Sequence, residues 1–110
     1  KALSALFGAV KFLMHLHDTR GLALTNTQAA MQLGVHKFET AAGGLGGCPF
    51  APGAAGNVAT EDTLNMMREM GIDTGIDNDV LHEAVLLVQQ YAPPPLVGHL
   101  PPLNKREPWV

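Results

Sequence analysis

The chain has 110 residues, of which 46% are hydrophobic and 15% charged, a composition typical of a globular protein about the size of one small domain. The net charge of −3 is spread along the chain without a basic patch, which argues against a nucleic-acid partner. No apolar run approaches the roughly 20 residues of a membrane span, and a single cysteine forms no internal disulfide, so we expect a protein of a reducing compartment without a membrane partner.

The first part of the chain alternates between helix-like and strand-like patterns. Residues 2–7 resemble the end of an amphipathic helix. Residues 10–17 are apolar and predict a buried strand of a parallel sheet. Residues 22–33 have the apolar spacing of a helix that stops at Gly34, and residues 35–41 predict a second strand.

The middle of the chain is a loop rich in glycine, proline and alanine over residues 42–58. Loops this long are uncommon in compact domains unless they are functional or disordered. Thr60 is suited to cap the next helix, which we expect to end near Met70. Glu61 and Asp62 then lie in the first turn, where carboxylates face the positive end of the helix.

A last helix is expected over residues 77–91. Strands that alternate with helices imply a parallel sheet, but two strands do not make a stable one, because both faces and both edges need cover. We therefore predict that residues 1–91 are the C-terminal part of a larger α/β barrel and that residues 92–110 are a proline-rich tail. The chain alone is expected to fold poorly or to aggregate.

Two histidines, His15 and His17, stand at the end of the first predicted strand. Side chains at i and i+2 of a strand share a face, and the carboxyl ends of barrel strands are where active sites lie. With oxygen ligands from elsewhere, two imidazoles suit Mg²⁺ or Mn²⁺. The alternative is two partly buried histidines bonded to their neighbours. Asp18 either orients an imidazole or caps the helix that follows.

The long loop carries the only cysteine, Cys48, after four glycines in five positions. A free cysteine is most often a small buried hydrophobe, but reactive thiols lie in partly exposed places such as this. The glycines lack the spacing of a dinucleotide-binding motif, and no phosphate-binding loop follows. Asn57, just before a helix, is either a turn residue or an oxygen ligand for a hard metal.

The remaining polar residues carry weaker indications. Arg20 has the chemistry to contact a carboxylate or phosphate, although an arginine in a turn is more often only solvated. The other three histidines have no evident partner in the sequence, and we assign no role to His36, His82 or His99.

Taken together, three motifs resemble those of the 3-hydroxy-3-methylglutaryl-CoA lyase family. The most specific is GLGGCPF at residues 44–50, and the supporting motifs are HLHDTRG at residues 15–21 and GNVATED at residues 56–62. The resemblance extends to about Tyr91. It implies a TIM (β/α)8 barrel, of which this chain is the C-terminal portion and which is incomplete in this chain.

The resemblance also implies a site and a reaction. The positions that match the family's functional residues are, for the metal, His15, His17 and Asn57; for catalysis, Cys48 and His15; and for the substrate or its loop, Arg20, Gly46 and Gly47. The implied reaction is a retro-Claisen cleavage of 3-hydroxy-3-methylglutaryl-CoA to acetyl-CoA and acetoacetate, dependent on Mg²⁺ or Mn²⁺. The implied enzyme is a homodimer of the cytoplasm or the mitochondrial matrix.

The chain departs from the family by lacking the remaining aspartate ligand and a substrate-binding arginine, whose positions would precede Lys1. The isolated chain is therefore expected to be inactive. One alternative is a lyase for a longer-branched 3-hydroxy-3-acylglutaryl-CoA. Another is a Claisen-type synthase such as isopropylmalate synthase, against which the Gly-Gly-Cys-Pro loop argues. A third is a non-catalytic fragment or interaction module.

Overall fold

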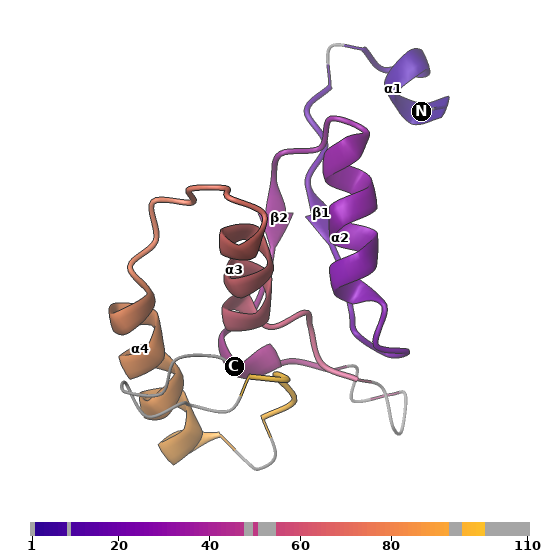
Figure 1. Cartoon of the computed structure of the whole chain (residues 1–110). Coiled ribbons are helices and arrows are strands. Elements are labelled where there is room, and N and C mark those ends of the chain that lie inside the picture. Colours follow the sequence, from indigo (N-terminus) through magenta and orange to yellow (C-terminus); the bar gives the residue numbers. More distant parts are fainter. Residues whose placement is uncertain (1, 9, 48–49, 51–54, 93–95, 101–110) are drawn as a thin grey trace.

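A computed structural model of the chain describes residues 2–8, 10–47, 50, 55–92 and 96–100. The elements occur in the order α1 (Ala2–Leu6), β1 (Met14–His15), α2 (Ala23–Gln32), β2 (Phe38–Glu39), the short 3₁₀ turn η1 (Ala42–Gly44), α3 (Thr60–Glu69) and α4 (Asn78–Tyr91). The helix α2 lies beside β1 and α3 lies beside β2, whereas α1 stands apart from the other elements (Figure 1).

The two strands form a parallel sheet in which Met14 pairs with Phe38 and His15 pairs with Glu39. Both strands are shorter than predicted. The expectation of a buried strand over residues 10–17 is wrong: the strand is only two residues long, every residue of the stretch is at least partly exposed, and Val10 and Leu13 are 54% and 55% exposed. The described part of the chain covers this stretch only in part, and without full cover an apolar segment gains little from extending the ladder.

A third segment joins the sheet where the two strands end. Asn57 forms an antiparallel bridge with His17, and Ala59 forms a parallel bridge with Ala41. Backbone hydrogen bonds hold this segment on both sides, among them those from Val58 N–H to the Leu16 carbonyl at 3.0 Å and from Ala41 N–H to the Val58 carbonyl at 3.1 Å. The residues after both strands and before α3 are thereby gathered at one end of the sheet.

The predicted helix boundaries are mostly confirmed. The side chain of Asp77 accepts hydrogen bonds from the first turn of α4, as an N-cap residue does. The prediction that Thr60 caps α3 is wrong by one position: the cap residue is Ala59, without a capping side chain, and Thr60 is the first helical residue. Its hydroxyl instead bonds that of Thr40 at 2.9 Å, because the loop brings the end of β2 against the start of α3.

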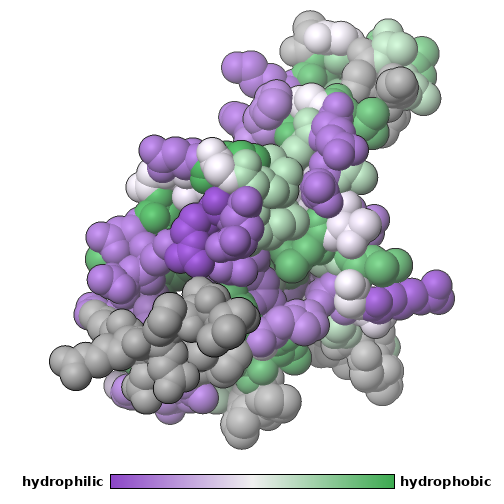
Figure 2. Space-filling model, in the orientation of Figure 1, coloured by the Kyte–Doolittle hydropathy of each residue, from purple (hydrophilic) through white to green (hydrophobic). Residues whose placement is uncertain are grey.

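The buried core is small for the amount of apolar surface. The buried hydrophobic residues are Ala23, Ala30, Val58, Ala59, Leu64 and Val85. Large apolar residues remain exposed on or next to every helix, and Figure 2 shows hydrophobic residues reaching the surface around the N-terminal end and over the middle of the molecule. The radius of gyration is 15.1 Å, against about 13 Å for a compact domain of this length. This packing fits an α/β unit with an unclosed sheet.

Within the described ranges, none of the helices combines the length and apolar character needed to cross a membrane.

Candidate active site

The two histidines of the HLH motif converge at the end of β1. Their Nε2 atoms lie 3.1 Å apart, and the ring planes are inclined by 61° with centroids 5.0 Å apart. The prediction that His15 and His17 project to the same face is therefore confirmed, since the i and i+2 positions of an extended chain point the same way.

Each imidazole is oriented through its other nitrogen. The Nδ1 atom of His15 lies 3.2 Å from the Glu39 carboxylate, and that of His17 lies 3.1 Å from the Ala55 carbonyl oxygen. Both partners are acceptors, so each Nδ1 can donate to its partner, and in that tautomer each Nε2 keeps its lone pair. Two such lone pairs 3.1 Å apart would repel each other unless a cation lay against both. This tautomer pattern is the one that metal-binding histidines adopt.

Asn57 faces the histidine pair across the bridge to His17. Its Nδ2 donates a hydrogen bond to the Leu45 carbonyl oxygen at 2.8 Å, which fixes the amide. Its Oδ1 is buried and accepts no hydrogen bond from any residue that the structure describes. A buried polar oxygen without a partner is costly, and such an atom calls for an explanation such as a bound ion.

The donor set fits a hard divalent cation. Two imidazole nitrogens and one amide oxygen are ligands that Mg²⁺ or Mn²⁺ accepts, and ligands at right angles with bonds near 2.1 Å lie about 3 Å apart. The described residues contain no group of three or more His, Cys, Asp or Glu side chains that would hold a metal. An ion bound here would complete its coordination with water, with substrate oxygens or with ligands from outside the described part of the chain.

Glycines allow the loop to approach Asn57 closely. A Cβ at Gly46, where φ is +105°, would lie 2.6 Å from the Asn57 Nδ2 atom, and a Cβ at Gly56 would collide with the Gly44 carbonyl oxygen. Side chains at Gly46 or Gly56 would therefore push the Asn57 amide out of its place. This steric requirement explains why the motif is rich in glycine on both sides of the long loop.

The family model described as HMGL-like matches residues 1–88. The chain belongs to the HMGL-like family. Among HMGL-like proteins it is 45% identical, over 96 residues, to the hydroxymethylglutaryl-CoA lyase YngG of Bacillus subtilis strain 168, covering 87% of this chain and 32% of that protein.

Two further HMGL-like relatives extend the comparison. The (R)-citramalyl-CoA lyase of Chloroflexus aurantiacus is 48% identical over 68 residues, which are 62% of this chain and 22% of that protein. The crystal structure of the Bacillus subtilis HMG-CoA lyase matches 89% of this chain and 33% of its own, with 44% identity and a TM-score of 0.81. The chain thus spans about a third or less of these relatives. The relatives include both cytoplasmic and mitochondrial forms.

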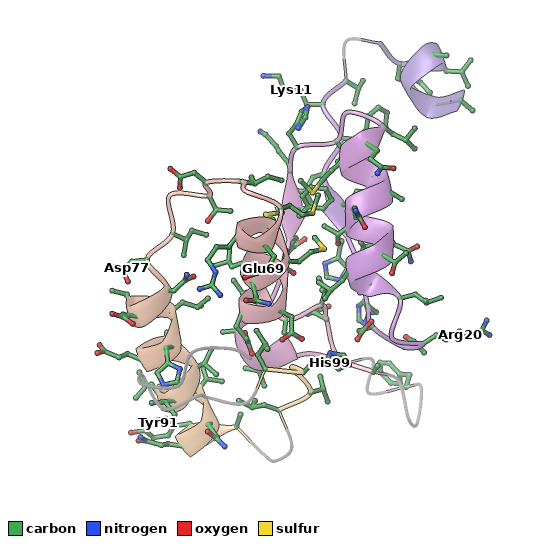
Figure 3. All side chains as sticks on the ribbon, in the orientation of Figure 1. Lys11, Arg20, Glu69, Asp77, Tyr91 and His99 are labelled. Carbon is green, nitrogen blue, oxygen red and sulfur yellow. The ribbon has the colours of Figure 1, made fainter. Side chains whose placement is uncertain are left out.

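Three of the predicted site residues are either exposed or lie outside the residues that the structure describes. Cys48 lies outside the described residues. Gly47 is exposed at the point where the described part of the loop ends. Arg20 is exposed in the turn after Asp18, and Figure 3 shows its side chain pointing outward. Their roles toward a substrate stay predictions.

Asp18 orients neither imidazole in the described part of the chain, and it is not the N-cap residue of α2, which is Leu22. Its Oδ1 accepts a hydrogen bond at 2.9 Å from the N–H of Ala23, the first residue of that helix. The residues that orient the imidazoles are instead Glu39 and Ala55. Glu39 was not identified from the sequence, and nothing local marks it, because its position opposite His15 depends on the register of the sheet.

The prediction that Glu61 and Asp62 lie in the first turn of α3 is confirmed, and both acids also bind distant backbone. The Glu61 carboxylate accepts a hydrogen bond from Gly43 N–H at 3.0 Å, and the Asp62 carboxylate accepts from His99 N–H at 2.7 Å and Leu100 N–H at 2.8 Å. His99 therefore has a partner, although none was evident in the sequence.

Burial raises the pKa of Glu61 above its ordinary value of 4.5. The hydrogen bonds from the backbone N–H groups of Glu61 and Gly43 oppose this shift, and the neighbouring charge of Asp62 adds to it. Glu61 accepts a hydrogen bond from Gly43 in the turn η1, so a change in its charge would alter that hydrogen bond.

Proposed function

We propose that this chain is the C-terminal part of a hydroxymethylglutaryl-CoA lyase, built as a TIM (β/α)8 barrel whose preceding strands it does not contain. The parent enzyme cleaves 3-hydroxy-3-methylglutaryl-CoA to acetyl-CoA and acetoacetate. The proposal is supported by the convergence of His15 and His17, and by Asn57, which is bridged to His17 and keeps a buried oxygen without a partner, in a chain of the HMGL-like family.

His15, His17 and Asn57 would hold a divalent cation, Mg²⁺ or Mn²⁺, with further ligands from the preceding part of the barrel. When bound, the cation polarises the tertiary hydroxyl and the neighbouring carbonyl oxygen of the substrate. The contribution of this chain is to hold the donors: Glu39 and Ala55 fix the two rings, and Leu45 fixes the Asn57 amide.

The reaction then needs a base and an acid. A base removes the proton of the tertiary hydroxyl, and the carbon–carbon bond breaks to give acetoacetate and the enolate of acetyl-CoA. We assign the protonation of that enolate carbon to the Cys48 thiol, carried on a glycine-rich loop that closes over the site and excludes water. We also assign His15 a part in the proton transfer, and its Nδ1 atom lies 3.2 Å from the Glu39 carboxylate.

The other assignments belong to the same proposal. Arg20, Gly46 and Gly47 serve the substrate and the loop, the complete enzyme is a homodimer, and it works in the cytoplasm or, as in some relatives, in the mitochondrion. A second acyl-CoA substrate is favoured by one observation, the 48% identity to a citramalyl-CoA lyase.

The deciding experiment measures acetoacetate release from 3-hydroxy-3-methylglutaryl-CoA by the full-length reading frame that contains this segment, with Mn²⁺ and with a chelator. Release that requires the metal supports the lyase. Absence of release, together with cleavage of citramalyl-CoA or a longer-branched substrate, changes the substrate but keeps the reaction. A folded, metal-loaded protein that cleaves none of these points to a non-catalytic role.

A further inference from the structure

The described residues of the tail, Leu96–Leu100, form no helix or strand but are held by four backbone hydrogen bonds. Val97 N–H and Gly98 N–H donate to the Gly43 carbonyl oxygen at 3.1 and 3.3 Å, and the N–H groups of His99 and Leu100 donate to Asp62. The seat is tight, because a Cβ at Gly98 would lie 2.6 Å from the Glu61 carboxylate. We call Leu96–Leu100 the strap.

The carboxylate of Asp62 binds the strap. Its side chain is 5% exposed, and both carboxylate oxygens accept hydrogen bonds from residues 37 and 38 positions further along the chain. A carboxylate is buried at this depth only when such donors satisfy it. Asp62 therefore ties the strap to the start of α3, the helix that directly follows the Asn57 segment.

The imidazole of His99 extends this tie toward the histidine pair. Its Nδ1 lies 3.1 Å from one oxygen of Asp62 and 3.8 Å from the Oδ2 atom of Asp18 (Figure 3 labels His99 near the start of α3). Asp18 directly follows His17, and its N–H donates to the Gly56 carbonyl oxygen at 3.1 Å. Asp18, which follows the candidate ligand His17, is thus bonded to the residue that precedes the candidate ligand Asn57. His99 contacts the side chain of the same Asp18.

We propose that His99 is a positioning residue that holds Asp18 close to Asp62. In this way it keeps the two candidate ligands, His17 and Asn57, at the distance from each other that metal binding requires. This inference rests on the proposed function, because it assigns the strap a role in the same site. His99 touches neither the substrate nor the candidate ligands and acts only through its two acidic partners.

The test compares His99→Ala, His99→Asn and the matched control His36→Ala in the full-length reading frame. In His99→Asn the side-chain amide nitrogen would take the place of the imidazole Nδ1, and His36 is an exposed histidine far from the strap in sequence. The measurements are the Mn²⁺ dissociation constant, kcat and KM separately, and the thermal midpoint in chelator. We expect His99→Ala to weaken Mn²⁺ binding about tenfold, as loss of an outer-shell partner does, and His99→Asn to restore most of it.

Each outcome decides the matter. Unchanged Mn²⁺ affinity in His99→Ala overturns the inference, and so does equal impairment or unfolding of both variants, because that would show a packing role only. A wild-type protein that binds Mn²⁺ but cleaves no 3-hydroxy-3-methylglutaryl-CoA refutes the proposed function, while the Mn²⁺ affinities still decide the role of His99. A wild-type protein that binds no Mn²⁺ refutes both.

Discussion

Replacing Gly56 by alanine tests how the candidate site is held together. An added Cβ would collide with the Gly44 carbonyl oxygen, lie 2.8 Å from the Gly46 carbonyl oxygen and lie 3.0 Å from the Val97 Cγ2 atom. The first two are backbone atoms and cannot rotate away. Moving residue 56 would strain its hydrogen bond from Asp18 N–H, which is worth about 1 kcal/mol, on top of an overpacking cost of roughly 1–3 kcal/mol.

We therefore expect Gly56→Ala to lose roughly 2–4 kcal/mol of stability, a fall of roughly 5–10 °C in the thermal midpoint of the complete enzyme. Mn²⁺ binding should weaken as well, because Asn57 follows directly. Gly34→Ala is the matched control: φ is +88° there, but an added Cβ meets nothing within 4 Å, so only a conformational cost of about 1–2 kcal/mol is expected. Equal losses in the two variants, with normal Mn²⁺ binding in both, would refute the reasoning.

The remaining predictions concern the loop, the imidazole, pH and the isolated chain. Cys48→Ala should leave Mn²⁺ binding intact and lower kcat by about 10²–10⁴-fold; near-normal turnover would remove Cys48 from the mechanism. Glu39→Ala should weaken Mn²⁺ binding about 10–100-fold by freeing His15, as titration calorimetry would show. Because the pKa of Glu61 is raised, its protonated carboxyl group favours folding at low pH, and this contribution is lost as the pH rises. The thermal midpoint of Glu61→Gln minus that of wild type should therefore increase between about pH 4 and 7. The isolated chain should aggregate, and a cooperative melt of a monomer would contradict this.

The features that sequence analysis predicted correctly are those with a local cause. The convergence of His15 and His17 follows from the two-residue period of an extended chain, and the last helix, expected over residues 77–91, follows from its apolar spacing. The place of Asn57 came from a motif resemblance, and the structure puts it opposite His17.

The features that were missed depend on parts of the chain that are distant in sequence. Glu39 meets His15 because of the strand register, and the short strands reflect missing cover that a residue pattern does not report. The partnership of His99 with Asp62 joins residues 37 positions apart through a tail that has no periodicity to interpret. Thr60 was misplaced by one position because its hydroxyl bonds Thr40 instead of its own helix.

The unclosed sheet also bears on how such an enzyme could be divided. Within the described residues β1 has a neighbouring strand on one side only, and a free strand edge pairs with whatever extended segment is offered. Co-expressed with the remainder of such a barrel, the chain is a natural candidate for fragment complementation, with cleavage restored only when the two polypeptides meet. Expressed without that remainder, the same edge would recruit a second copy of the chain, so productive assembly and self-association compete for one surface.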